Sequence, residues 1–139
     1  MSTNSTIAIQ NLDGTVDQIY CHWDGNVEHN GFILESFYSD RARLEKLISG
    51  GDISSLGPVI ADAPKDFDEY HEDFTNYYSY RGEPVRVNHY ESFEGYENNL
   101  EYMEFNYIFT NDDVWSVIEE GKDWEDLEYR LAITADNCE

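Results

Sequence analysis

The strong acidity of this chain limits what it can fold into. Its 139 residues include 30 Asp and Glu against eight Lys and Arg, which gives a formal net charge of −22. Charge repulsion of this size opposes a compact state. Aromatic residues nevertheless make up 15% of the chain, and disordered chains are poor in such residues. We therefore expect a folded protein with one domain over residues 1–139.

The negative charge is concentrated in the C-terminal part of the chain. Residues 1–60 contain 8 acids and 3 bases, whereas residues 61–139 contain 22 acids and 5 bases. A field of this sign repels nucleic acids and anionic membranes, and it attracts basic surfaces. No basic patch alternates with aromatic residues, so the sequence predicts no direct binding to nucleic acid.

The compartment is predicted from what the sequence lacks. No apolar run approaches the roughly 18 residues that a membrane-spanning helix needs. The polar segment 1–7 has no basic residue before an apolar stretch, which argues against a secretory signal. We therefore expect an intracellular protein, in which Cys21 and Cys138 are free thiols rather than a disulfide.

The first half of the chain predicts a β-hairpin followed by two helices. Strands are expected over residues 3–9 and 15–23, joined by a turn at residues 11–14 that contains Asp-Gly, a strong hairpin signal. Helical spacing follows over residues 29–38 and 41–48. Ser39-Asp40 are the expected N-cap of the second helix, and Gly50-Gly51 its C-terminal end.

The second half predicts a less regular middle and a second hairpin. The i, i+3, i+7 spacing of Phe67, Tyr70 and Phe74 favours a short amphipathic helix. A short strand is expected over residues 84–90, and a loop or helical turn over 91–99. Strands at residues 102–110 and 114–118 then precede a terminal helix with Trp124, Leu127 and Leu131 as its apolar stripe.

These elements together predict an α+β fold. We expect a mainly antiparallel sheet built from the N- and C-terminal β-hairpins, with helices packed on one face. The pattern contains no internal repeat and no linker.

The densest group of chemically capable residues is Cys21-His22-Trp23-Asp24, with Glu28 and His29 nearby. These residue types ligate metals, but their spacing is not a zinc pattern, and neighbours in a strand point to opposite faces. Cys21 is also a candidate nucleophile with His71 or His89, although surrounding acids raise the pKa of a thiol. The structural alternative is a strand end with a tight Gly turn and a core Trp. We therefore expect no enzyme activity, no catalytic residue and no cofactor.

Two acidic stretches rich in aromatic residues are the stronger signal. Residues 62–73 carry six acids against Lys65, and residues 91–128 carry thirteen against Lys122. Carboxylates held on a rigid surface resemble DNA phosphates, which recur about every 1.7 Å of helix axis. The candidate partner-binding residues are Asp66, Asp68, Glu69, Glu72, Asp73, Glu94, Glu97, Glu101, Glu104, Asp112 and Asp113. Solubility and salt adaptation are the alternative explanations, since the chain has only three Lys residues.

The N-terminal third carries several distinctive blocks of sequence. These are Ser5-Thr6-Ile7-Ala8-Ile9, Asp13-Gly14-Thr15-Val16, residues 19–25 and residues 51–57. They resemble a family of small proteins encoded by tailed bacteriophages and prophages. Asn26-Val27-Glu28 departs from the Tyr-Pro-Glu type of stretch that is commoner there. The family has no assigned activity, so the resemblance implies a phage origin and a role in the host cytoplasm, but no catalytic residue.

Charge and resemblance together lead to one main functional hypothesis. We expect an inhibitor that occupies the basic groove of a host nucleic-acid-handling or defence protein, such as a nuclease, a restriction or CRISPR effector, or RNA polymerase. Two alternatives stay open: a small metal- or ligand-binding protein that uses the Cys21–His29 segment, and a phage structural or assembly accessory.

Overall fold

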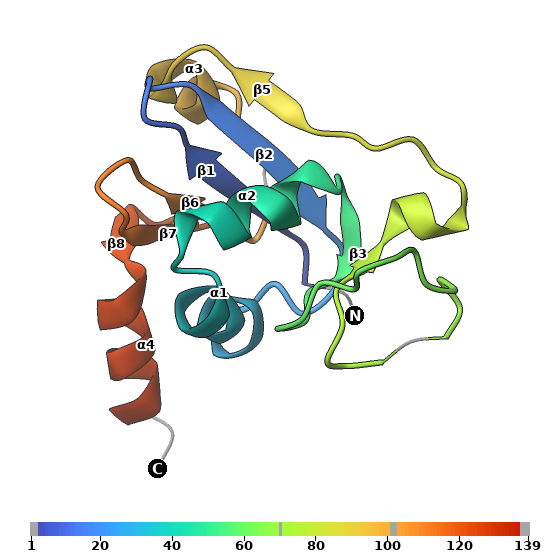
Figure 1. Ribbon diagram of the computed structural model, residues 1–139. Coiled ribbons are helices and arrows are strands. Elements are labelled where there is room, and N and C mark those ends of the chain that lie inside the picture. The colour runs from blue at the N-terminus through green and yellow to red at the C-terminus, as the bar shows by residue number, and fades with distance from the viewer. Residues whose placement is uncertain (1–2, 70, 101–102, 137–139) are drawn as a thin grey trace.

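The computed structural model describes residues 3–69, 71–100 and 103–136, and a mixed sheet of eight strands organises them (Figure 1). The spatial order is β4 (Asn76–Tyr77), β3 (Ile53–Ser55), β2 (Val16–Cys21), β1 (Ser5–Gln10), β6 (Phe105–Phe109), β7 (Trp115–Glu119) and β8 (Trp124–Asp126). The short strand β5 (Asn88–Tyr90) also pairs with β2. The predicted α+β fold with a mainly antiparallel sheet is confirmed.

The N-terminal hairpin forms as its sequence predicts. β1 and β2 pair in register from Ser5 opposite Cys21 to Gln10 opposite Val16. The turn closes with a 2.7 Å hydrogen bond from the Asn11 amide to the Thr15 carbonyl, and Gly14 adopts a φ of 93°. A positive φ is accessible to glycine without strain, which explains the Asp-Gly signal.

The two hairpins are joined by a parallel pairing at the centre of the sheet. β1 lies beside β6 with Ile7 opposite Tyr107, and β6 continues antiparallel into β7. A buried 2.6 Å hydrogen bond from Thr6 Oγ1 to Asn106 Oδ1 spans the two strands. About 100 residues separate the strands in the chain, so local sequence patterns carry no information about this contact.

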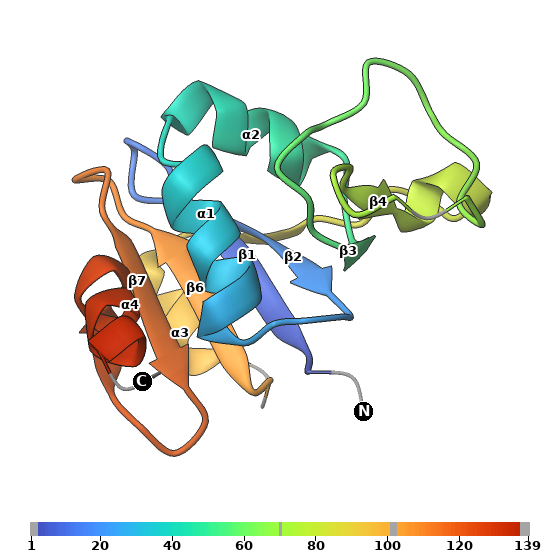
Figure 2. The same cartoon turned by 90° about the horizontal axis from the view of Figure 1, so that it is seen from below.

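The main core lies between the sheet and three α-helices. α1 (Phe32–Phe37) follows a π-helical turn at Val27–Gly31, α2 (Arg41–Ser49) is capped by Asp40, and α4 (Leu127–Asp136) closes the same face (Figure 2). Alternate strand residues such as Ile7, Ile9 and Ile19 are fully buried against them. Burial of each such side chain stabilises the fold by about 1.5–3 kcal/mol. No helix in the described ranges is long and apolar enough to cross a bilayer.

The opposite face of the sheet carries a second, smaller core under α3 (Phe93–Asn98). Tyr96 of this helix is fully buried against Ala8, Val16 and Ile108. The expectation of helices on one face thus holds for α1, α2 and α4, while α3 covers the other side. The prediction that Trp124 belongs to the terminal helix is wrong: Trp124 lies in β8 opposite Ile118 and packs on this second core.

The expected amphipathic helix around Phe67 and Phe74 does not form. Residues 61–75, which we call the acidic loop, contain turns and no helix among the described positions, and Tyr70 lies outside them. The Asp66 side chain accepts a 3.0 Å hydrogen bond from the Asp68 amide. Asp side chains that bond the backbone locally compete with helix formation, and repulsion between close acids adds to the cost. The loop leads instead into β4 and a 3-10 turn at Tyr78–Arg81.

Candidate functional site

The Trp23-Asp24-Gly25 turn stands at the end of β2. The Trp23 amide still bonds the Ser54 carbonyl at 2.9 Å, so the turn stays attached to β3. Asp24 has a φ of 57°, which Asp tolerates better than most residues. A side chain at Gly25 would lie 2.7 Å from Ser5 Cβ and 2.8 Å from the Thr3 carbonyl oxygen. The glycine is therefore required for the chain to pass β1 this closely.

The expectation that Trp23 is a core residue is wrong, because its side chain is 44% exposed. Asn30, rather than Trp23, is fully buried at this turn. Asn30 Nδ2 contacts Cys21 Sγ at 3.2 Å and the Trp23 carbonyl oxygen at 3.4 Å. Because β2 ends at Cys21, the alternation of side chains along a strand no longer determines the direction of the Trp23 side chain.

The geometry does not support Cys21 as a nucleophile. Its side chain is fully buried, and burial raises the pKa of the thiol to about 12. The proposed bases are engaged elsewhere, since His89 Nδ1 lies 2.7 Å from Asp17 and His71 Nδ1 accepts the Asp73 amide. A thiol that stays protonated is inert.

The same segment does not form a metal site in the part of the chain that the structure describes. His22 Nδ1 bonds Tyr20 at 2.7 Å, and His29 Nδ1 bonds Asn30 at 2.9 Å. No three His, Cys, Asp or Glu side chains come together there closely enough to hold one ion. The Cys21–His29 cluster is thus dispersed in space although it is dense in sequence.

A pocket of about 500 Å³ opens beside the Trp23-Asp24 turn. One side belongs to the ends of β2 and β3, and the other to the acidic loop. The lining residues are Trp23, Asp24, Ser54, Ser55, Phe67, Asp68 and Asn76. This pocket brings together two segments that lie far apart in the sequence, the Cys-His-Trp-Asp-Gly block and the first acidic stretch. Ser54 and Ser55 were not singled out as site residues, although they belong to the block at residues 51–57.

The acidic loop is fastened at its base by four backbone and side-chain contacts. The Val59 amide bonds the Asp73 carbonyl, and the Thr75 amide bonds the Val59 carbonyl, each at 2.9 Å. Thr75 Oγ1 is buried, accepts the Gly57 amide at 3.1 Å and donates to the Gly57 carbonyl at 3.0 Å. Figure 1 shows the loop extending beyond the β3–β4 edge of the sheet. These bonds close the loop at its base, where residues 57–59 meet residues 73–75, while the six acids between them are exposed.

The carboxylates of this loop are exposed and largely without cations. Asp62, Asp66, Asp68, Glu69, Glu72 and Asp73 are all exposed. Among the described residues, Lys and Arg form ion pairs with four acids elsewhere: Glu83, Asp113, Glu119 and Glu125. Lys65, the one base of residues 62–73, lies over the Phe74 ring at 4.4 Å. The first predicted stretch is thus a surface whose negative charge is largely uncompensated, with His71 3.6 Å from Asp73.

The second predicted stretch is divided over several elements. Glu94 and Glu97 lie on α3, where Glu97 accepts the Trp124 indole N–H at 2.9 Å. Glu104 precedes β6, and Asp112 is in the β6–β7 turn. Glu101 lies outside the described residues. α3 covers the sheet face opposite α1 and α2, whereas the acidic loop extends from the β3–β4 edge (Figures 1 and 2). The two stretches therefore do not form one continuous site.

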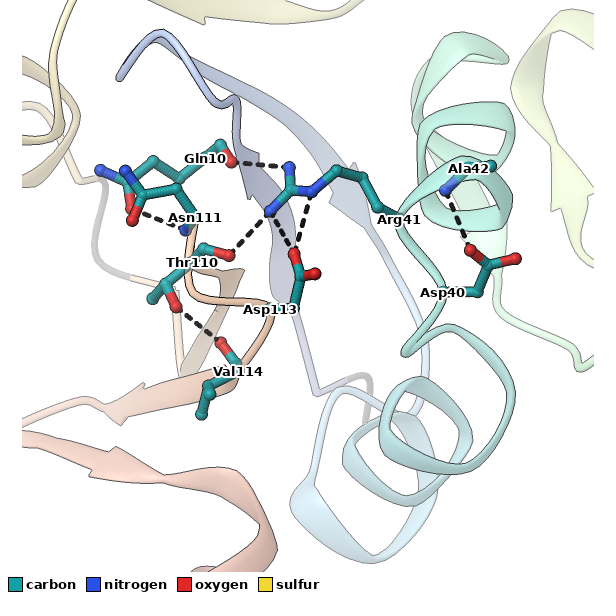
Figure 3. Close-up of polar contacts among 8 residues, drawn as sticks. All are labelled: Gln10, Asp40, Arg41, Ala42, Thr110, Asn111, Asp113 and Val114. Carbon is teal, nitrogen blue, oxygen red and sulfur yellow. Dashed lines mark hydrogen bonds and ion pairs between the residues drawn. The ribbon is translucent and has the colours of Figure 1, made fainter.

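Asp113 has a structural partner. Its carboxylate accepts from Arg41 Nη2 at 2.8 Å and Nε at 3.0 Å, while the same guanidinium donates to the Gln10 and Thr110 carbonyls at 2.8 Å (Figure 3). Arg41 begins α2, Gln10 ends β1, and Thr110 follows β6. The guanidinium therefore ties the first turn of α2 to the ends of two central strands.

The Arg41→Met variant should lose about 1–3 kcal/mol of unfolding free energy, because two carbonyls lose a charged donor. Asp113→Asn should cost less than about 1 kcal/mol, since the carboxylate is largely exposed. Urea denaturation of both variants measures the difference. An equal loss in both would show that the ion pair, rather than the bonds to the carbonyls, stabilises this corner.

Comparison with known proteins adds no family to this description. No protein-family model, no curated protein and no solved structure matches the chain.

Proposed function

We propose that this chain is an acidic binding protein that occupies the basic, nucleic-acid-binding surface of another protein, and that the acidic loop is its contact surface. The supporting observation is the set of six exposed acids on a loop whose C-terminal residues Asp73 and Thr75 are hydrogen-bonded to the segment 57–59 that precedes the loop. Anchored ends reduce the conformational entropy that is lost when a loop binds.

The charge pattern favours a basic groove over other partners. A net charge of −22 repels nucleic acids and anionic lipids. Complementary charge speeds association with basic proteins and makes that association sensitive to salt. A phage-encoded inhibitor of a host nuclease, defence effector or polymerase, acting in the host cytoplasm, is the form of this function that we propose.

The test is capture of proteins from a bacterial lysate by the tagged full-length chain at low salt. We expect a nucleic-acid-binding protein that elutes at moderate salt and is displaced by duplex DNA, because both ligands would use one groove. Five loop acids outside the pocket are neutralised in the test variant: Asp62→Asn, Asp66→Asn, Glu69→Gln, Glu72→Gln and Asp73→Asn. Affinity for the captured protein should fall at least about tenfold, since close charge pairs at interfaces can couple by more than about 1.5 kcal/mol.

A matched variant separates position from total charge. It neutralises five exposed acids elsewhere: Glu94→Gln, Glu104→Gln, Asp112→Asn, Glu120→Gln and Asp123→Asn. We expect this control to retain most of its binding. Equal loss in both variants would mean that net charge alone drives capture, and unchanged binding by the loop variant would overturn the proposed surface.

A further inference from the structure

The pocket beside Trp23 has aromatic walls that suit a flat cation. Trp23 is 44% exposed although it is among the largest apolar side chains of the protein. The His22 ring contacts it edge-on, with ring centroids 4.7 Å apart and an angle of 85° between the ring planes. Phe67 lines the same pocket from the acidic loop. An indole face is the best aromatic partner for a positive charge.

The charged groups that line this pocket are carboxylates. Asp24 contributes one from the β2 end and Asp68 another from the acidic loop. Both side chains are exposed, and neither is paired with a Lys or Arg among the described residues. The pocket lining contains no basic residue. A cation that enters would meet two acceptors of charge-assisted hydrogen bonds.

The pocket lining includes a residue with a buried, unpaired hydroxyl. Ser55 lines the pocket and is 6% exposed, and its Oγ has no hydrogen-bond partner within the described residues. Buried polar atoms are nearly always paired, so an unpaired one calls for an explanation. A donor group of a bound ligand would satisfy it once the Ser55 side chain turned toward the pocket.

We propose that this pocket receives an arginine side chain of the protein that the acidic loop binds, an inference that rests on the proposed function. A guanidinium is planar, stacks on aromatic faces and has five N–H donors, whereas a lysine ammonium is a compact and strongly hydrated charge. The pocket volume of about 500 Å³ lies within the range of sites that enclose such groups.

The chain itself already shows this kind of contact. The Arg81 guanidinium lies 4.8 Å from the centroid of the Phe67 ring and 4.8 Å from that of Tyr78. Arg81 is paired with Glu83 and does not line the pocket. Its charge is thus compensated by Glu83, while Asp24 and Asp68 stay available to a second guanidinium.

The experiment titrates the full-length chain with N-acetyl-arginine amide and follows the Trp23 indole N–H by NMR. We expect saturable binding, and at least about fivefold weaker binding of N-acetyl-lysine amide. Asp24→Asn with Asp68→Asn should abolish the response, and Asn tolerates the φ of 57° at position 24, so the turn is preserved. Trp23→Ala, read from neighbouring amides, should weaken binding similarly, and Trp23→Phe should restore part of it.

Several outcomes would overturn the inference. Equal affinity for the arginine and lysine probes would show that the pocket attracts positive charge without selecting a guanidinium. Unchanged binding by the double Asp variant would show that Asp24 and Asp68 are not the acceptors. Tighter binding of free arginine than of the blocked probe would make the pocket a site for the amino acid itself.

The two proposals fail separately. If the five-acid loop variant loses capture while Trp23→Ala captures normally, the acidic surface stands and the arginine pocket fails. If the arginine probe binds but neutralising the loop changes nothing, the pocket stands and the acidic surface fails. Asp68 is left intact in the loop variant for this reason.

Discussion

The Tyr107→Ala variant should lose about 3–5 kcal/mol of unfolding free energy, which is a large part of the stability of a domain this size. Tyr107 is fully buried in β6, between Ile7 of β1 and Val117 of β7. Its hydroxyl donates to the Gly25 carbonyl at 2.6 Å. Burial holds the pKa of this phenol well above its ordinary value of 10, so it remains a donor at neutral pH.

Tyr107→Phe separates packing from the hydrogen bond. It keeps the ring and leaves the buried Gly25 carbonyl without its donor, so we expect a loss of about 1–2 kcal/mol. Urea denaturation at one fixed ionic strength measures both variants, because urea is uncharged and leaves the screening of the chain's self-repulsion constant. A Phe variant as stable as the parent would show that Gly25 finds another partner. Since Gly25 follows Asp24, the same bond positions one wall of the pocket.

The Gly57→Ala variant should detach the base of the acidic loop. A Cβ at this position would lie 2.6 Å from the carbonyl carbon of Phe74 and 2.8 Å from the carbonyl oxygen of Asp73. These are backbone atoms in the segment that bonds Val59, so the strain is relieved only by breaking those bonds. We expect a loss of about 1–3 kcal/mol in global stability, together with faster amide hydrogen exchange at Val59 and Thr75.

Gly95→Ala is the matched control for this prediction. Gly95 lies in α3, where the nearest atom to an added Cβ is Ser92 Oγ at 3.4 Å, an ordinary contact. Alanine favours helices over glycine by about 1 kcal/mol, so this variant should be neutral or more stable. Unchanged exchange at Val59 and Thr75 in Gly57→Ala would contradict the proposed anchoring, and with it the rigidity assumed for the contact surface.

Local patterns predicted the elements that depend on neighbours in the chain. The first hairpin follows from alternation and the Asp-Gly turn, and α2 begins at the expected cap, where Asp40 accepts the Ala42 amide at 3.3 Å. β6 and β7 pair as expected from Phe105 to Glu119. In each case the interactions that select the structure lie within one hairpin or one helical turn.

The failures arise where interactions that residue spacing does not show compete with the predicted structure. Spacing placed Trp124 on a helix, but pairing with Ile118 draws it into β8 and onto the second core. Spacing also favoured a helix around Phe67, where acid repulsion and the Asp66–Asp68 contact oppose one. Alternation also placed Trp23 in the core, but β2 ends at Cys21 and Asn30 is the residue buried at the turn.

The sequence by itself determined the acidity, the fold class and the segments that carry the candidate chemistry. Only the tertiary structure decided which acids lie close together. It places Asp24 and Asp68 around one pocket, ties Asp113 to Arg41, and puts α3 on the opposite face from the main helices. The reason is that a carboxylate's role depends on the cations, rings and hydroxyls within a few ångströms of it, and chain folding brings those groups in from segments far apart in sequence.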